Sequence, residues 1–278
     1  MRVYWANMIV ALAFVLGGCE VIPEAERLVP VDTPAGGGRR HMLVEYTGFR
    51  CVNCPSAAET AEQLQSLYGD ELIVVSMHPA SNPFTQGLYD YTCPMADSLY
   101  LWMGGTASTP FPTGNIDLQA ADDGYLIDPL EWPGQLLQAM QDTAAPYLEV
   151  SAYGDSLTGE LKIEVAMGAT AAMDCRLAVW LTEDSVHGVQ AMPDGSVNSD
   201  YIHRHMLRTA ITPERFGIPC SLSTSVSMQI LDGRCPDECV ADQCHIVALL
   251  LDKDDYHLLQ AYETTITYIS DPLAMPQR

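Results

Sequence analysis

The feature that most constrains the fold is a pair of cysteines placed between a strand and a helix. The apolar segment 42–46 predicts a strand, and a glycine-containing turn separates it from the tetrapeptide Cys51-Val-Asn-Cys54. Pro55 and the alanine-rich segment 56–67 follow, and proline in the first turn is typical of a helix start. Because the dipole and free N–H groups of a helix N-terminus stabilise a thiolate, we expect Cys51 to be nucleophilic.

This arrangement resembles the thioredoxin family, which carries a buried acid six residues before the first cysteine. Glu45 has this spacing from Cys51. The resemblance implies that Glu45 has a pKa raised by burial and serves as a general base for the second cysteine. Strand alternation leaves a solvent-facing Glu45 as the alternative. Arg50 stands where the family usually has tryptophan, and a guanidinium beside Cys51 would lower the pKa of that thiol.

The thioredoxin family also places a cis-proline opposite its cysteines, just before a strand. Pro112 in the run Thr-Pro-Phe-Pro-Thr is the better match, because a threonine and apolar residues follow it. An ordinary trans loop proline is the alternative, since cis X-Pro bonds are a small minority. The resemblance implies that the backbone before Pro112 pairs with a bound thiol substrate.

Further segments complete a thioredoxin-like α/β domain over residues 40–146. The apolar run 72–77 predicts a buried parallel strand, which gives a strand–helix–strand unit with the elements around the cysteines. Helices are predicted over 95–102 and 129–145, and the region between 79 and 109 reads as an irregular insertion.

Residues 1–18 are typical of a signal peptide, with one arginine before a short apolar stretch. The sequence Leu-Gly-Gly-Cys19 resembles the lipobox of bacterial lipoproteins, and this resemblance implies lipidation of Cys19 and anchoring to a membrane. An ordinary signal peptide with a coincidental cysteine is the alternative. Residues 19–39 contain a triple glycine and several acids, which favours a flexible tether.

The remainder, residues 147–278, predicts a second domain of β-strands with sandwich-like architecture. The expected strands, bounded by turn residues, are 147–153, 161–167, 175–182, 225–231, 245–251 and 258–268. Residues 252–255 join the last two as a hairpin, and no convincing helix is present.

The chain has nine cysteines, and eight are left when Cys19 is set aside. An even number of cysteines in an exported chain favours disulfides. Cys51 and Cys54 form one pair. The other structural candidates, whose connectivity stays open, are Cys93, Cys175, Cys220, Cys235, Cys239 and Cys244. The spacing within 235–244 lacks the two Cys-x-x-Cys hooks of a zinc site, so this segment is interpreted as a disulfide-stapled loop with Cys175 and Cys220 as candidate partners.

No metal or other cofactor is predicted. His203 and His205 would share a face if they lay in a strand, but a third ligand at a diagnostic spacing is missing, and a hydrogen-bonded pair is the favoured interpretation. After loss of the signal, 12 basic and 36 acidic residues remain, a formal charge of −24. This charge argues against binding of nucleic acid or of anionic lipid through the protein surface.

Two motifs about 150 residues apart together resemble the Omp28-related lipoproteins of Bacteroidetes: Thr47-Gly-Phe-Arg-Cys-Val-Asn-Cys-Pro55 and Tyr201-Ile-His-Arg-His-Met-Leu-Arg208. The resemblance implies a lipid-anchored outer-membrane protein with a thioredoxin-like domain and a β-rich domain. Thiol–disulfide exchange with protein thiols through Cys51 and Cys54 is one expected function. A non-catalytic binding or adhesion lipoprotein, or an accessory subunit of an outer-membrane complex, is the alternative.

Overall fold

The computed structural model describes residues 38–269. The predicted signal peptide, Cys19 and nearly all of the predicted tether lie outside the described residues. Within 38–269, no helix has the length and apolar character needed to cross a membrane.

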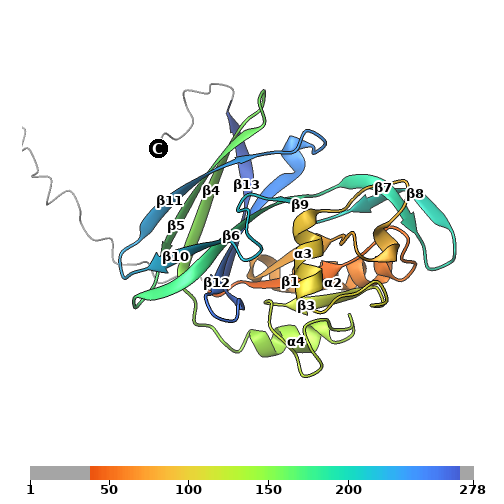
Figure 1. Ribbon diagram of the computed structural model, residues 1–278, viewed down its shortest axis with the longest axis horizontal. Helices are drawn as coiled ribbons and strands as arrows, with labels where there is room; N and C mark the ends of the chain where they lie inside the picture. Colours follow the sequence, from red (N-terminus) through yellow and green to blue (C-terminus); the bar gives the residue numbers. More distant parts are fainter. Residues whose placement is uncertain (1–37, 270–278) are drawn as a thin grey trace, which may run out of the picture. The chain divides into compact units, whose positions relative to one another are not determined.

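The elements predicted around the cysteine pair are confirmed (Figure 1). Strand β1 (His41–Tyr46) pairs in parallel with β2 (Leu72–Met77), and helix α2 (Cys54–Tyr68) connects them. Strand β3 (Thr113–Ile116) pairs antiparallel with β1. Every residue of these three strands is buried, which explains why the sequences of β1 and β2 are mostly apolar.

The two faces of this small sheet pack against different helices. One face meets α3 (Pro94–Trp102), and the other meets α2 and α4 (Trp132–Ala139). Helix α4 is shorter than the predicted 129–145, because Pro133 fixes its first turn and the chain leaves the helix at Met140. Short 3-10 turns lie at Gly69–Glu71, Pro83–Thr85 and Ala241–Gln243.

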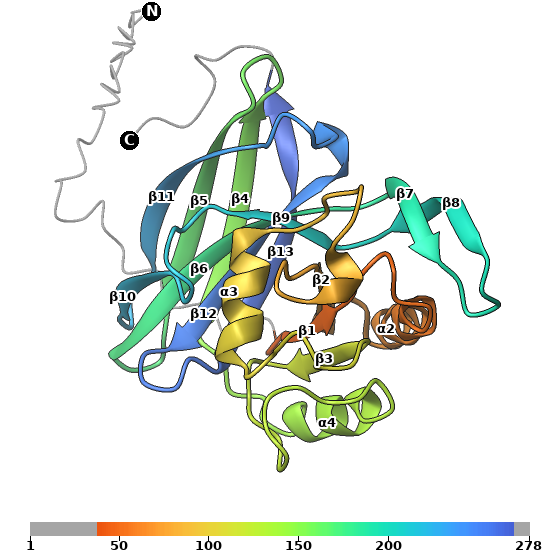
Figure 2. The same ribbon diagram turned by 45° about the vertical axis from the view of Figure 1, so that its right-hand side comes forward.

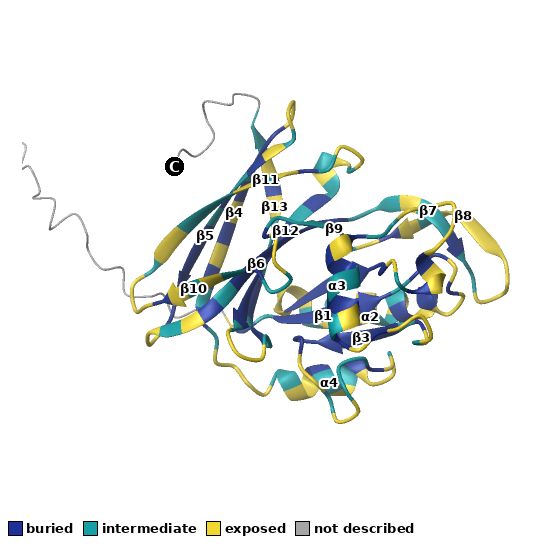
Figure 3. Ribbon diagram, viewed as in Figure 1, coloured by how far each residue is buried: buried dark blue, intermediate teal, exposed yellow. Residues whose placement is uncertain are grey.

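The rest of the described chain is all β, as predicted. Its strands are β4 (Tyr147–Asp155), β5 (Glu160–Gly168), β6 (Met173–Glu183), β7 (Val186–Ala191), β8 (Val197–His203), β9 (Met206–Ala210), β10 (Ile218–Leu222), β11 (Ser227–Arg234), β12 (Cys244–Asp252) and β13 (Leu258–Ile269). Strands β7 to β10 were not predicted. They are short, and most of their residues are exposed or half-buried, so they lack the apolar alternation by which the other strands were found (Figure 3).

One mixed sheet contains every strand except β7 and β8. Its order is β11-β5-β4-β13-β12-β6-β9-β2-β1-β3, with β10 also paired to β6. Alternate residues of β6 and β12 face two different cores, which is why segments such as Leu177–Leu181 are apolar at every position and fully buried.

The strands of the second half pack in a sandwich-like manner although they belong to one sheet. The inner faces of β4 and β5 pack on the inner faces of β6 and β12 in a common core. Strand β13 connects the two layers, because its first part pairs antiparallel with β12 and its last part pairs in parallel with β4.

The segments 40–146 and 147–269 share both the sheet and a core. Strand β2 pairs with β9 at Ser76 and Met206, and apolar residues of β1, β2 and α3 lie in the same core as Trp180, Val247 and Leu249. Cys51 and Cys54 of the first sequence motif belong to this same core.

Candidate functional site

The centre of the candidate site is the cysteine pair at the start of α2. Cys51 and Cys54 form a disulfide, with their Cα atoms 5.4 Å apart. A tight turn, in which the Cys51 N–H donates to the Gly48 carbonyl over 2.9 Å, brings the chain from β1 to the helix. Cys54 is the first helical residue and Pro55 lies in the first turn, as predicted.

Pro112 lies at the same end of β1 as the cysteine pair. The Phe111–Pro112 peptide bond is cis, and β3 begins at the next residue, Thr113, which pairs with Tyr46. The trans alternative is therefore wrong. The role of this proline in substrate binding stays a prediction.

Glu45 is buried in β1, with 2 % of its surface exposed, so the solvent-facing alternative is wrong. The hydroxyl of Ser76 donates to Glu45 Oε2 over 3.1 Å, while Oε1 has no hydrogen-bond partner within 38–269. Removal of the carboxylate from water raises its pKa to about 7. A carboxyl group with this pKa can both accept and donate a proton near neutral pH.

Glu45 and Cys54 line one small cavity of about 30 Å³, together with His78 and His203. Both ring nitrogens of His78 and Nε2 of His203 are buried without hydrogen-bond partners in the described part of the chain. Burial lowers the pKa of His78 to about 3 and that of His203 to about 4. The cavity therefore brings one carboxyl group with a raised pKa and two neutral imidazoles to the buried side of the disulfide.

The second sequence motif, 201–208, supplies the far wall of this cavity. Tyr201 and His203 line it, and Arg204 Nε contacts Glu62 Oε1 of α2 at 3.0 Å. The His205 carbonyl accepts the Ser76 N–H over 2.8 Å, beside Glu45. Two motifs that are far apart in the sequence thus form a single site.

His203 and His205 do not share a face. Strand β8 ends at His203, and His205 has a φ of 52°, which turns the chain between them. The His203 ring contacts Tyr91 at a centroid distance of 5.0 Å, whereas His205 Nδ1 lies 3.4 Å from Asp184. A metal site on a shared face would require His203 and His205 to lie in one strand, and they do not.

A hairpin of β7 and β8 contacts the backbone of the loop that carries Cys51, and sequence reasoning missed it. Gln190 Nε2 donates to the Cys51 carbonyl over 2.8 Å, and the Ala191 N–H donates to the Phe49 carbonyl over 2.8 Å. Figure 2 shows the hairpin beyond α2, apart from the large sheet. Cys51 and Cys54 are each only 1 % exposed, and both belong to the core that contains residues of β1, β2 and α3. Polar residues in the hairpin gave no sequence signal for such a contact.

Arg50 is exposed and donates from Nη1 to the Gln86 carbonyl over 3.2 Å. Its predicted effect on the pKa of Cys51 stays a prediction.

The remaining cysteines fall into three places. Cys175 and Cys220 face each other across β6 and β10, with their sulfurs 2.9 Å apart, so they adjoin each other and not the loop to which sequence reasoning assigned them. Cys93 is buried in the same core as the disulfide. Cys235, Cys239 and Cys244 form a separate cluster.

The sequence matches the family described as outer membrane protein Omp28 over residues 106–267. The chain belongs to this family, and its location is the bacterial outer membrane. The match contains the second motif and most of the β-rich half, and it begins after the cysteine pair.

Among solved structures, the chain is similar to HBP35 of Porphyromonas gingivalis, with 14 % identity, a TM-score of 0.68, and coverage of 87 % of this chain and 80 % of that one. This likeness shows a shared fold. A protein from Agrobacterium tumefaciens matches with 10 % identity, a TM-score of 0.49 and coverage of 88 % and 100 %. A domain of the outer membrane lipoprotein Omp28 from P. gingivalis matches with 16 % identity, a TM-score of 0.32 and coverage of 45 % and 90 %. No curated protein sequence matches the chain.

Proposed function

We propose that this outer-membrane protein exchanges thiols and disulfides with other envelope proteins through Cys51 and Cys54, which sit in a thioredoxin-like domain. The observation that carries the proposal is Glu45: a buried carboxyl group with a pKa raised to about 7 lines the same cavity as Cys54. The lipid anchor at Cys19 and the sandwich-like β-domain are parts of the same proposal, which tethers the exchange site to the membrane.

The chemistry starts from the Cys51–Cys54 disulfide. A thiolate of a dithiol substrate attacks Cys51 Sγ, a mixed disulfide forms, and Cys54 leaves as a thiolate. Protonated Glu45 gives its proton to Cys54. The second substrate thiol, as a thiolate, then attacks the substrate sulfur of the mixed disulfide, and Cys51 leaves as a thiolate that takes a proton from water. The substrate is thereby oxidised to a disulfide and the cysteine pair is reduced to two thiols.

Exchange requires the structure around the pair to open, because Cys51 is only 1 % exposed and cannot meet a protein thiol as it stands. We assign this opening to the β7–β8 hairpin, which contacts Cys51 through Gln190. Hydrogen bonds from Gln190 and Ala191 and one from the Val189 N–H to the Tyr91 hydroxyl, over 3.2 Å, hold the hairpin against the rest of the domain. The Arg204–Glu62 ion pair and the contacts of the His203 ring with Tyr91 and His78 add to them. A substrate that displaces the hairpin would gain access to Cys51.

The test is oxidation of a reduced, unfolded RNase substrate by the full chain in detergent. We expect refolding activity that is lost in Cys51→Ser and reduced roughly 10- to 100-fold in Glu45→Gln, in line with the contribution of a general acid–base group. Glu149→Gln, on the exposed side of β4, is the matched control and should retain full activity. Equal activity of wild type and Cys51→Ser would falsify the proposal.

A second function, a binding or adhesion protein with a structural Cys51–Cys54 disulfide, is favoured by the burial of both cysteines in the core. In that case the reduction potential of the pair should lie below about −300 mV, the range of structural disulfides, whereas an exchange site should lie above it. Equilibration with glutathione or dithiothreitol buffers measures this value.

A further inference from the structure

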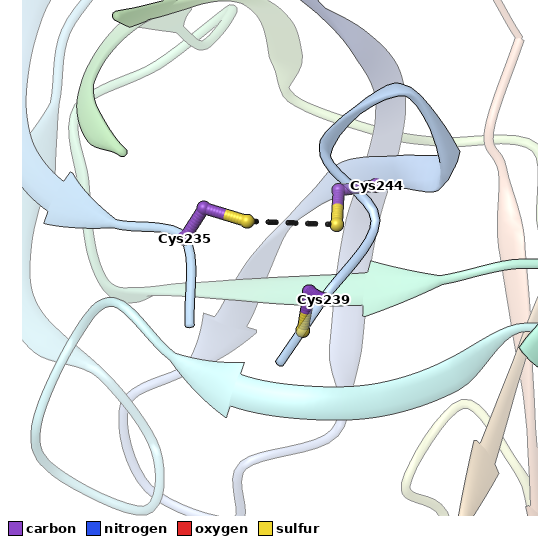
Figure 4. Close-up of side chains that lie close together, drawn as sticks. All are labelled: Cys235, Cys239 and Cys244. Carbon is purple, nitrogen blue, oxygen red and sulfur yellow. Dashed lines mark hydrogen bonds between the residues drawn. The ribbon is translucent and has the colours of Figure 1, made fainter. Parts of the chain in front are cut away.

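The cysteines between β11 and β12 form a cluster of three thiols (Figure 4). Cys235 directly follows β11, Cys239 lies in the connecting loop, and Cys244 opens β12. Their sulfurs all lie within 4.8 Å of one another, and those of Cys235 and Cys244 are 3.8 Å apart. None of the three is joined to another cysteine in the structure.

Non-covalent contacts hold the loop in this shape. The Cys235 N–H donates to the Gly159 carbonyl over 2.9 Å, and the Cys239 N–H closes a turn onto the Pro236 carbonyl over 3.0 Å. The Val240 N–H donates to Glu183 Oε1 over 2.6 Å, and Glu183 is in turn held by Arg208 of the second motif at 3.1 Å. The convergence of the sulfurs therefore does not depend on a covalent bond between them.

We propose that Cys235, Cys239 and Cys244 bind one thiophilic cation, Cu(I), through three thiolates. A metal–sulfur bond of about 2.3 Å places the sulfurs of a three-thiolate centre roughly 3.8–4.0 Å apart, close to the observed separation. No imidazole or carboxylate of the described residues joins this cluster, so the donor set is all sulfur, which suits Cu(I). A disulfide would use two of the thiols and leave the third without a role.

The surroundings favour a cation that arrives from solvent. Cys235 and Cys244 are 5 % and 3 % exposed, while Cys239 is partly exposed beside a pocket of about 220 Å³. The acids Asp155 and Asp237 line this pocket, with Arg234 as their basic neighbour. The buried pair can exclude competing ligands, and the exposed thiol gives the ion a path of entry.

The experiment titrates Cu(I) anaerobically into the reduced full chain in detergent, in competition with a chromophoric Cu(I) chelator. The chain carries Cys51→Ser, Cys54→Ser and Cys175→Ser so that neither the exchange site nor the Cys175–Cys220 pair binds copper. We expect one Cu(I) per chain, and Cys239→Ser should weaken binding by at least about 100-fold, because loss of a ligand costs more than the 10–100-fold of a lost outer hydrogen-bond partner.

Cys220→Ser is the matched control, since it removes an equally half-buried thiol outside the cluster, and it should leave the affinity for Cu(I) unchanged. Equal binding by the Cys239→Ser chain, or an equal loss in Cys220→Ser, would overturn the proposal. Peptide mapping of the wild-type chain isolated from membranes without reductant gives a second test that does not depend on the folding of any variant. A full disulfide within 235–244 in that sample also overturns it, whereas three alkylatable thiols support it.

Discussion

At the scale of the residue, Glu45 shows how position decides chemistry. The side chain points into the protein from a strand that is buried on both faces, and Ser76 is its one hydrogen-bond partner within 38–269. A carboxylate in such surroundings is costly, so the group takes up a proton more readily than it would in water. The cost appears in the folded state alone and therefore links the stability of the protein to pH.

We predict that Glu45→Gln removes a pH-dependent penalty on stability. The pKa of Glu45 is raised from 4.5 to about 7 on folding, so the folded state holds the proton more tightly, and wild type loses stability as pH rises through this window. Relative to Glu45→Gln, wild type should lose about 3 kcal/mol of unfolding free energy between about pH 4 and about pH 7. Urea denaturation of both chains across that range measures the difference, and parallel curves would contradict the assignment.

His78 and His203 should change the pH dependence of the unfolding free energy in the direction opposite to that of Glu45. Their pKa values are lowered on folding to about 3 and about 4, so the unfolded chain binds protons first as pH falls below 6.5. The stabilising contribution is complete above pH 6.5 and is lost in acid. In a chain with Glu45→Gln, the unfolding free energy should therefore fall from about pH 6.5 to about pH 4. Adding His78→Phe should flatten this slope, and the exposed His187→Phe should leave it unchanged.

At the scale of the element, the edge strand β10 depends on one neighbour. It pairs with β6 alone among the described strands, and Cys220 sits directly opposite Cys175 in that pairing. The two sulfurs are close enough to bond after a small adjustment, and an oxidising compartment would close the link.

We predict a Cys175–Cys220 disulfide in the exported chain. It would link cysteines 45 positions apart in the sequence and, on the chain-entropy view, stabilise the folded state by about 4 kcal/mol. Non-reducing peptide mapping identifies the link. The double change Cys175→Ser, Cys220→Ser should lower the melting temperature. The single change Cys93→Ser, which leaves the Cys175–Cys220 link intact, serves as the comparison. Detection of both thiols as free after export would refute the pairing.

The β7–β8 hairpin is the other element with a specific task. We predict that Gln190→Ala speeds reduction of the Cys51–Cys54 disulfide by a phosphine several-fold, since it removes the hydrogen bonds to the Cys51 and Gly48 carbonyls. The exposed Asn198→Ala in the same hairpin is the control. Stopped-flow or quenched alkylation gives the rates, and identical rates for Gln190→Ala and wild type would show that other contacts hold the hairpin closed.

At the scale of the whole molecule, the shared sheet ties the two halves together. A fragment ending at residue 146 would expose the edge of β2 that pairs with β9. It would also expose the apolar residues that pack on β6 and β12. We predict that such a fragment fails to unfold cooperatively, whereas the full described chain does, as measured by near-ultraviolet circular dichroism during urea titration. A cooperative transition in the fragment would show that residues 40–146 fold alone.

Sequence reasoning located what is encoded locally. The strand, turn, cysteine pair and helix were found because the apolar run, Pro55 and the spacing of Glu45 all lie within one segment, and Pro112 was found from its neighbours. Contacts between distant segments were beyond reach. Nothing in the sequence shows that Gln190 reaches Cys51, that His203 meets His78, or that β2 and β9 join two halves in one sheet.

The hydrogen bond from Gln190 to the Cys51 carbonyl has a thermodynamic consequence. If the hairpin holds the oxidised pair more tightly than the reduced pair, oxidation must in turn hold the hairpin more tightly, because coupling between two equilibria is reciprocal. A partner that binds the hairpin only when it has moved away from Cys51 would then shift the midpoint potential of the cysteines. The shift is roughly 30 mV for each 1.4 kcal/mol by which the partner prefers that position of the hairpin. Binding at the surface of the protein would thus set the reduction potential of a buried disulfide.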